Sequence, residues 1–315
     1  MSGKPLQSED READKGMQWK YDIVVIGAGA AGIAAAKSAF AFGCRSILLI
    51  DARKQMGGVL IQCAHHGFGS GLTGPEYIEK LTVDFPEEAE VWLDTTVLSI
   101  KKEKELVVSG EAVGVRTVSF QQLILAAGCL EIPIGNLAAA GTRPKGIYTA
   151  GQMQEMIHLY QEVPEEPVVI LGSGDLGLIL AADLSQKGIK VGAIVEQNPG
   201  CGGMAVNQKC LAEYQIPLIC SSTITRIYGT DWITEVEITN LQTGKKDRMP
   251  CRSLLTAVGL RPDWSLLEGL EHPYPDWIHI CGNCRKVHPV IEAVIKEGKK
   301  AGSEAWACIQ KESGG

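Results

Sequence analysis

A glycine-rich segment near the start of the chain carries the residue types that bind a dinucleotide diphosphate. Gly27, Gly29 and Gly32 follow a short apolar run in the order G-x-G-x-x-G. The first glycine makes a tight turn, the second leaves room for a pyrophosphate against the backbone, and the third lets a helix pack closely on the preceding strand. The alanine-rich helix that follows, with Ala30 and Ala31 in its first turn, would direct free N–H groups and a positive dipole end at the phosphates.

The same pattern occurs a second time further along the chain. Gly172, Gly174 and Gly177 repeat the three glycines, and Glu196 lies at the position that Asp51 has in the first copy. Each acidic residue ends the next apolar run, where a carboxylate can bind the two hydroxyls of an adenosine ribose. One such motif alone is a weak signal, but two copies with the same acid spacing are a strong one. The sequence therefore predicts an α/β fold with two Rossmann-like dinucleotide-binding domains.

The duplication also predicts where the domains begin and end. Gly57-Gly58 is matched by Gly202-Gly203, and Ala127-Gly128 by Val258-Gly259. The last two pairs end apolar runs where we expect the chain to cross between domains. We predict a flexible tail at 1–20, a first domain formed by 21–150 and 259–315, and a second domain, 151–258, inserted into the first.

The second copy differs from the first inside its glycine loop. Asp175 stands where the first copy has Ala30. A carboxylate there can cap the helix N-terminus, and it would repel a pyrophosphate. Glu196 is followed by Gln197 and Asn198 rather than by arginine, which favours NADH over NADPH. The residues leave three possibilities open for this fold: NADH, another adenine nucleotide, or no ligand.

Composition narrows the class of partner. The 315 residues include 30 basic and 37 acidic side chains, a net charge of −7, which argues against nucleic acid or an anionic membrane surface as the main partner. No apolar run approaches the roughly 20 residues of a membrane span. The polar N-terminal segment lacks the apolar core of a secretory signal, so we expect a cytoplasmic protein.

Ten cysteines without an export signal predict mainly buried thiols in a reducing compartment. Cys281 and Cys284 form one C-x-x-C pair, and no second pair lies at zinc spacing, so no metal is predicted. Cys281 ends a predicted strand, and Cys284 would begin a helical turn whose dipole lowers a thiol pKa. The pair is therefore a candidate redox dithiol, with two buried thiols as the alternative.

Paired Rossmann-like folds with these crossing strands resemble the two-dinucleotide-binding-domain flavoproteins of the pyridine nucleotide-disulfide oxidoreductase superfamily, the class of thioredoxin and glutathione reductases. The resemblance implies FAD in the first domain and NAD(H) in the second. It also implies a closing Gly-Asp motif, which here reads Gly282-Asn283. The implied FAD-binding residues are Gly27, Gly29, Ala30, Ala31, Gly32, Asp51, Gly57, Gly58, Ala127, Gly128, Gly282 and Asn283. Those implied for NAD are Gly172, Gly174, Asp175, Gly177, Glu196 and Gly259.

A narrower resemblance rests on the segments MGGVLIQCAHHGFG, LTGPEY, AAGTRPKGIYTAG, VVILGSGDLGLILA and CGNCRKVH. These look like the FAD-dependent oxidoreductase subunits that accompany anaerobic-type glycerol-3-phosphate dehydrogenases, with the opine, hydrogen cyanide and dye-linked proline dehydrogenase flavin subunits as more distant relatives. This implies other dehydrogenase subunits as partners. The chain departs from the subgroup in lacking about 20 residues before the closing strand, and in having Cys284 and Pro289.

The resemblance also defines the catalytic candidates. A thioredoxin-reductase dithiol is excluded, since the interval 129–171 holds only Cys129. The cysteine pair of glutathione-reductase-type enzymes is incomplete, because Cys63 follows Gly57-Gly58 without a second cysteine. Cys63 could lie near the flavin ring or be a small buried filler. His288 could contact the flavin pyrimidine or be a structural histidine. The C-terminal dimerisation domain of glutathione reductases is expected to be absent, because the chain ends soon after the closing helix.

Three functions remain in view. The first is an FAD subunit of a dehydrogenase complex, which moves electrons between FAD and NADH or a partner's redox group. The second is a free-standing NADH-dependent reductase of a disulfide, a quinone or an electron carrier, using Cys63 or the Cys281/Cys284 pair. The third is a nucleotide-binding scaffold without turnover.

Overall fold

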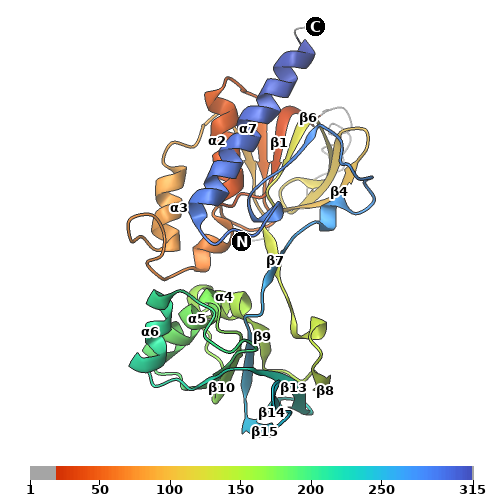
Figure 1. Cartoon of the computed structure of the whole chain (residues 1–315). Helices are drawn as coiled ribbons and strands as arrows, with labels where there is room; N and C mark the ends of the chain where they lie inside the picture. The colour runs from red at the N-terminus through yellow and green to blue at the C-terminus, as the bar shows by residue number, and fades with distance from the viewer. Residues whose placement is uncertain (1–18, 314–315) are drawn as a thin grey trace, which may run out of the picture. The chain divides into compact units, whose positions relative to one another are not determined.

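The computed structural model of the chain describes residues 19–313. These residues form two compact units, called here the first and the second domain, which are coloured along the chain in Figure 1. Among the described residues, the first domain comprises 19–60, 76–128 and 262–313, and the second comprises Ile61–Pro75 and Cys129–Arg261.

The first domain is built on a mainly parallel sheet in the order β3-β2-β1-β6-β5-β4, with β18 also paired to β6. Strand β6 is long enough to pair with two neighbours on the same side: its first residues pair with β5, and Leu123–Leu125 pair with β18. The strands are β1 (Trp19–Ile26), β2 (Ile47–Ile50), β3 (Glu90–Trp92), β4 (Thr95–Lys101), β5 (Glu105–Gly110), β6 (Gly114–Leu125) and β18 (Ile278–Ile280).

Two helices of the first domain, α2 (Ala30–Ala41) and α7 (Ile291–Ser313), lie side by side in Figure 1. They approach closely because α7 presents glycines to the alanine-rich α2. A Cβ added to Gly298 would lie 2.1 Å from the carbonyl oxygen of Ala31, and one added to Gly302 would lie 2.1 Å from that of Ala35. Only glycine permits such an approach, so these two residues fix the position of α7. The domain also contains η2 (Gly58–Gln62), α3 (Gly74–Thr82), η4 (Ser265–Leu267) and η5 (Gly282–Cys284), of which η2 and α3 extend past its boundary.

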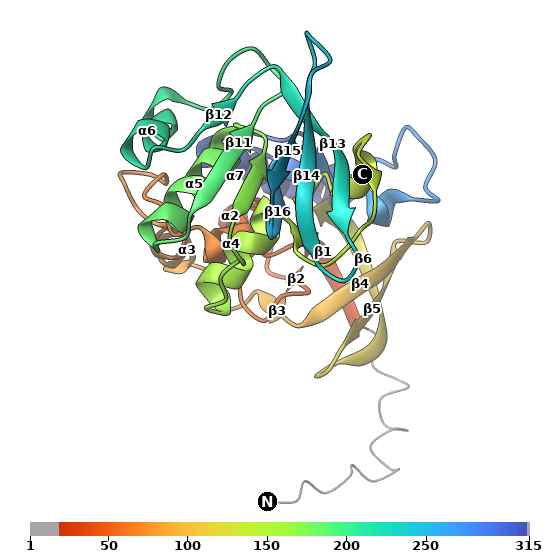
Figure 2. The ribbon, with the colours of Figure 1, turned by 90° about the horizontal axis from the view of Figure 1, so that it is seen from below.

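The second domain has three layers. Its central parallel sheet has the order β12-β11-β10-β16-β9. Alternate residues of a strand face opposite sides of the sheet. Accordingly, Val168 and Ile170 of β10 belong to a core shared with the helices, whereas Val169 and Leu171 belong to a core shared with an antiparallel sheet. Figure 2 shows β13, β14 and β15 of that sheet running side by side.

The elements of the second domain range from two to twelve residues in length. The strands are β7 (Cys129–Glu131), β8 (Ala140–Gly141), β9 (Ile147–Thr149), β10 (Val168–Leu171), β11 (Val191–Val195), β12 (Leu218–Ile219), β13 (Ser222–Gly229), β14 (Ile233–Asn240), β15 (Lys246–Pro250), β16 (Ser253–Thr256) and β17 (Leu260–Pro262). The helices are η3 (Ile134–Asn136), α4 (Ala150–Leu159), α5 (Asp175–Gln186) and α6 (Ala205–Glu213).

The first crossing lies after Gly128, whereas the sequence predicted it after residue 150. Two contacts explain the difference. Glu131 of β7 binds the start of α4, where its carboxylate accepts hydrogen bonds from the Thr149 hydroxyl and from the Gly151 N–H at 2.9 Å. Strand β9 is an edge strand of the second sheet, paired with β16. Residues 129–150 therefore pack with the second domain.

Three other boundaries also differ from the prediction. The return crossing lies after Arg261 rather than after residue 258, since β17 pairs with β7. Residues 61–75 pack with the second domain, where the Gln62 amide donates to the Gly151 carbonyl oxygen at 2.8 Å. Of the predicted tail, 1–20, only Trp19 and Lys20 are described, and they begin β1. The rest of that tail lies outside the described residues.

Two features are missing from residues 19–313. No helix there is long and apolar enough to cross a membrane. Within the same residues, no group of three or more His, Cys, Asp or Glu side chains is placed to hold a metal ion.

Candidate dinucleotide-binding sites

The first glycine loop, at the end of β1, has the shape that the sequence predicted. Gly27 has φ +102°, and a Cβ there would lie 2.4 Å from the Ala126 carbonyl oxygen. A Cβ at Gly32 would lie 1.8 Å from the Gly27 carbonyl oxygen. At Gly29, by contrast, the nearest atom to an added Cβ is the Cα of Gly58, at 3.8 Å. The outer two glycines are closed in by backbone while the middle one is open, which fits a diphosphate lying against Gly29.

The start of α2 suits an anion. Gly29 is its N-cap residue and provides no side-chain hydrogen bond, and the first turn, which contains Ala30 and Ala31, has no acidic residue. The first N–H groups of a helix lack partners within the helix, and its dipole places partial positive charge there.

Asp51 lies next to this loop at the end of β2. Its Oδ2 accepts a hydrogen bond from the Ala28 N–H at 2.6 Å, and its Oδ1 accepts one from the Arg53 N–H at 2.8 Å. A carboxylate has about four acceptor sites, so these two bonds leave capacity for ribose hydroxyls. The Asp51 side chain is partly exposed.

Two further segments converge on the first loop. Gly57 forms a parallel bridge with Gly29, and its N–H donates to the Ala28 carbonyl oxygen at 2.7 Å. Gly282 follows β18 at the carboxyl end of the sheet, and a Cβ there would lie 2.7 Å from the Ala31 Cβ. The carboxyl ends of parallel strands are where α/β sheets bind ligands.

The remaining residues predicted for the first nucleotide are near this edge of the sheet. Ala127 and Gly128 follow β6, and Gly128 has φ +83° with no heavy atom within 4 Å of an added Cβ. Asn283 uses its side-chain oxygen within its own turn, where Oδ1 accepts the His288 N–H at 2.9 Å.

The second loop repeats the geometry of the first. Gly172 has φ +105° and an added Cβ would lie 2.3 Å from the Ala257 carbonyl oxygen, while one at Gly177 would lie 2.3 Å from the Gly172 carbonyl oxygen. At Gly174 no heavy atom lies within 4 Å of an added Cβ. Gly259, after the crossing strand, has φ +132°. The middle glycine is again the open one.

Glu196, the acidic residue of the second copy, is only 5% exposed and is more heavily hydrogen-bonded than Asp51. Its Oε2 accepts from the Ser173 N–H at 2.9 Å and the Ser173 hydroxyl at 2.7 Å, and its Oε1 accepts from the N–H and the side-chain amide of Asn198, both at 2.8 Å. Burial alone raises the pKa of Glu196, but the hydrogen bonds from Asn198 and Ser173 outweigh it and leave the pKa below its usual value. The carboxylate is therefore ionised at neutral pH.

Asp175 does not cap its own helix, so this part of the sequence prediction is wrong. Gly174 is the N-cap residue of α5, without a side-chain cap. The Asp175 Oδ1 instead accepts hydrogen bonds from the Met204 N–H at 2.8 Å and from the Asn207 side-chain amide at 2.6 Å. It thereby fastens the start of α6 to the start of α5, a contact between distant residues that local sequence rules do not reveal.

The candidate redox thiols are buried. Burial raises the pKa of Cys63 to about 11. It also raises the pKa of Cys281 to about 12, with smaller contributions from nearby Cys284 and Glu297. The Cys284 thiol is fully buried and donates to the Asp263 carbonyl oxygen at 3.0 Å. Because the thiolate is the reactive species, this burial does not favour redox chemistry at Cys63 or Cys281.

The candidate histidine, His288, faces a carboxylate. Its Nε2 lies 3.2 Å from the Oε1 of Glu297 on α7. Sequence reasoning missed Glu297 and also Ser173, which bridges Glu196 to the Gly202 N–H. Glu297 lies outside every motif of the sequence, and Ser173 occupies an unspecified position of the glycine motif, so no signal in the sequence pointed to either residue.

Comparison with known proteins places the chain in a family. The family model described as pyridine nucleotide-disulphide oxidoreductase matches residues 21–290. The hydrogen cyanide synthase subunit HcnB of Pseudomonas protegens is 32% identical over 179 residues, which are 55% of this chain and 38% of that protein. An opine oxidase subunit of Rhizobium meliloti is 28% identical over 54% of this chain and 34% of that protein. The chain thus spans little more than a third of the length of these curated relatives.

Solved structures show the same fold. Thioredoxin reductase of T. acidophilum superposes with a TM-score of 0.76 at 20% identity, covering 93% of this chain and 100% of that one. L-proline dehydrogenase from P. horikoshii superposes with a TM-score of 0.67 at 20% identity, covering 94% of this chain and 56% of that one. The predicted fold class, two Rossmann-like domains in an α/β arrangement, is confirmed. The chain belongs to the pyridine nucleotide-disulphide oxidoreductase family, whose members are oxidoreductases that bind FAD and NAD(P)H.

Proposed function

We propose that FAD binds at the first glycine loop and NADH at the second, and that the chain is the flavin subunit of a cytoplasmic dehydrogenase complex. The observation that carries the nucleotide assignment is the pair of open middle glycines, Gly29 and Gly174, each between glycines enclosed by backbone. When bound, FAD supplies two-electron hydride chemistry. The chain's own contribution is to hold the diphosphates at the two helix starts and the ribose hydroxyls at Asp51 and Glu196.

The charges around Glu196 support NADH over NADPH. The 2′-phosphate of NADPH needs a nearby cation, and it would meet the ionised carboxylate of Glu196. Residues 197–203, which follow Glu196 and return to the glycine loop, contain neither lysine nor arginine. A free ribose hydroxyl can donate to the Glu196 carboxylate in place of one of its present donors, Ser173 or Asn198, whereas a phosphate cannot.

Two observations support a role within a larger enzyme. The relatives HcnB and the opine oxidase protein are themselves named as subunits. In addition, the burial of Cys63 and Cys281 gives no support to either thiol as the acceptor in a free-standing disulfide reductase. We therefore propose that FAD exchanges electrons with a redox group on a partner protein. The sequence segments that resemble the glycerol-3-phosphate dehydrogenase-associated subgroup favour a flavoprotein of that kind as the partner.

Two matched substitutions test the nucleotide assignment. Gly29 and Gly174 have φ near −77° and −63°, and an added methyl group meets only ordinary contact or open space. Gly29→Ala and Gly174→Ala should therefore fold as the wild type does. We expect Gly29→Ala to weaken FAD binding at least about tenfold and Gly174→Ala to weaken NADH binding to the same degree, because each methyl group occupies the space of a diphosphate.

Each variant is the control for the other. FAD binding is followed by flavin fluorescence quenching and NADH binding by calorimetry, with melting temperature as the measure of folding. Equal loss of both nucleotides in both variants, or no loss in either, would contradict the assignment. Tighter binding of NADPH than of NADH by the wild type would contradict the choice of NADH.

A further inference from the structure

We propose that Glu297 of α7 is a positioning residue that holds the turn after β18 against the FAD-binding loop. This turn, residues 281–288, is called here the closing turn. The inference rests on the proposed FAD site and adds a residue that no sequence motif indicated.

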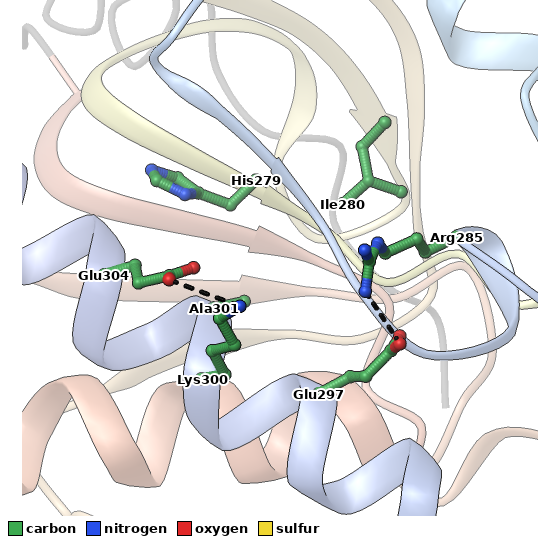
Figure 3. Close-up of a pocket in the computed structure, with 7 residues that line it drawn as sticks. All are labelled: His279, Ile280, Arg285, Glu297, Lys300, Ala301 and Glu304. Atoms are coloured by element: carbon green, nitrogen blue, oxygen red, sulfur yellow. Dashed lines mark hydrogen bonds and ion pairs between the residues drawn. The ribbon is translucent and has the colours of Figure 1, made fainter.

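Both carboxylate oxygens of Glu297 bind the closing turn. Oε2 accepts the Gly282 N–H at 3.0 Å, and Oε1 accepts the Arg285 guanidinium at 2.9 Å. Oε1 also lies 3.2 Å from the Nε2 of His288. Figure 3 shows the Glu297 side chain directed from α7 toward the Arg285 guanidinium. Both residues line a cavity of about 250 Å³. One side chain thus contacts the beginning, the middle and the end of the turn.

The backbone of the closing turn lies directly against the first turn of α2. Gly282 has φ +63°, in the left-handed region that glycine adopts readily. It lies so close to the first turn of α2 that an added Cβ would be 2.7 Å from the Cβ of Ala31. The Gly282 N–H points back to Glu297, so its hydrogen bond fixes the orientation of the peptide that faces α2. A shift here would move the turn relative to the open space at Gly29.

The negative charge of Glu297 is neutralised by a neighbouring cation, so it is compatible with a diphosphate nearby. A lone carboxylate would repel phosphates, but the Glu297 side chain is only 18% exposed and is paired with the Arg285 guanidinium. A charge-assisted hydrogen bond of this kind is stronger than a neutral one and holds its geometry better. Because Glu297 is next to Gly298, the contact of α7 with α2 sets the position of the carboxylate.

The test compares Glu297→Ala, Glu297→Gln and a matched control, Glu304→Gln. Glu304 lines the same cavity two turns further along α7 and pairs with Lys300 on its own helix at 3.6 Å. In the full-length protein we expect Glu297→Ala to weaken FAD binding at least about tenfold. Glu297→Gln keeps one acceptor oxygen and should lose less FAD affinity than Glu297→Ala. Glu304→Gln should bind FAD as the wild type does.

The bound flavin gives a second readout. If Glu297 positions the closing turn, the visible absorption band and the reduction potential of the remaining bound flavin should shift in Glu297→Ala and Glu297→Gln but not in Glu304→Gln. Binding of NADH to the second domain should be unchanged, which shows that the variants fold. Wild-type affinity and an unshifted flavin spectrum in Glu297→Ala would overturn the inference, as would an equal loss in Glu304→Gln. A wild type that binds no FAD would instead overturn the proposed function.

Discussion

At the scale of single residues, the carboxylates beside the two glycine loops occupy equivalent positions but have different surroundings. Asp51 accepts two backbone hydrogen bonds and remains partly exposed, whereas Glu196 is buried and accepts four. The two Glu196 oxygens are thus already held by Ser173 and Asn198. Since a carboxylate has about four acceptor sites, a ribose hydroxyl at Glu196 would have to replace one of these four hydrogen bonds, whereas Asp51 can accept further ones.

Thiol reactivity gives a prediction at this scale. With pKa values raised to about 11 and about 12, Cys63 and Cys281 carry very little thiolate at pH 8. We expect Cys63 to react with iodoacetamide at least about a hundredfold, and Cys281 at least about a thousandfold, more slowly than a free thiol does. Both rates should rise with pH up to these pKa values. Mass spectrometry of the alkylated native protein measures this, with unfolded protein as the control. Rapid labelling of either residue at pH 8 would restore the thiol-based reductase as a candidate.

At the scale of elements, the contact between α2 and α7 determines the first site. The two helices meet through Ala31 and Ala35 on one side and Gly298 and Gly302 on the other, with backbone against backbone. This contact places the start of α2, Glu297 and the closing turn together. A change in the packing of α7 should therefore alter FAD binding even when no residue of the site is touched.

The substitution Gly298→Ala tests this coupling. Its methyl group would lie 2.1 Å from the Ala31 carbonyl oxygen, so α7 must move away from α2. We expect a loss of about 2 kcal/mol or more in the free energy of unfolding, and weaker FAD binding. Chemical denaturation and flavin titration measure the two effects.

Gly135→Ala provides the control for this substitution, because no heavy atom lies within 4 Å of a Cβ at Gly135. Gly135→Ala should change neither the free energy of unfolding nor FAD binding. Unchanged stability in Gly298→Ala would show that α7 does not pack on α2 as described.

At the scale of the whole molecule, each domain has its own core and its own glycine loop. The first domain's sheet and the second domain's three layers are stabilised by separate clusters of buried residues. Ligands that bind only the native state stabilise it in proportion to the logarithm of their concentration relative to Kd. Each nucleotide should therefore stabilise the domain that holds it.

Calorimetry of the full-length protein can separate the two effects. At 100 times Kd, a ligand adds about 2.7 kcal/mol, or roughly 5–10 °C for domains of this size. We expect FAD and NADH to raise the melting temperature independently, with the FAD effect lost in Gly29→Ala and the NADH effect lost in Gly174→Ala. Stabilisation by FAD alone would mean that the second loop holds another adenine nucleotide or none.

The sequence by itself determined the position of the two glycine loops and the α/β class. Glycine spacing acts through local backbone geometry, so Gly27, Gly29 and Gly32 could be assigned from their order alone, and the second copy confirmed the pattern. The apolar runs before them specify buried strands for the same local reason.

Only the tertiary structure decided the contacts between distant residues. The hydrogen bond between Glu131 and the start of α4 places residues 129–150 in the second domain. Asp175 binds the start of α6 instead of capping α5, and Glu297 accepts a hydrogen bond from the closing turn. Burial, which depends on how the layers pack, set the thiol pKa values of Cys63 and Cys281. These properties depend on which residues meet in space, and spacing along the chain carries no information about that.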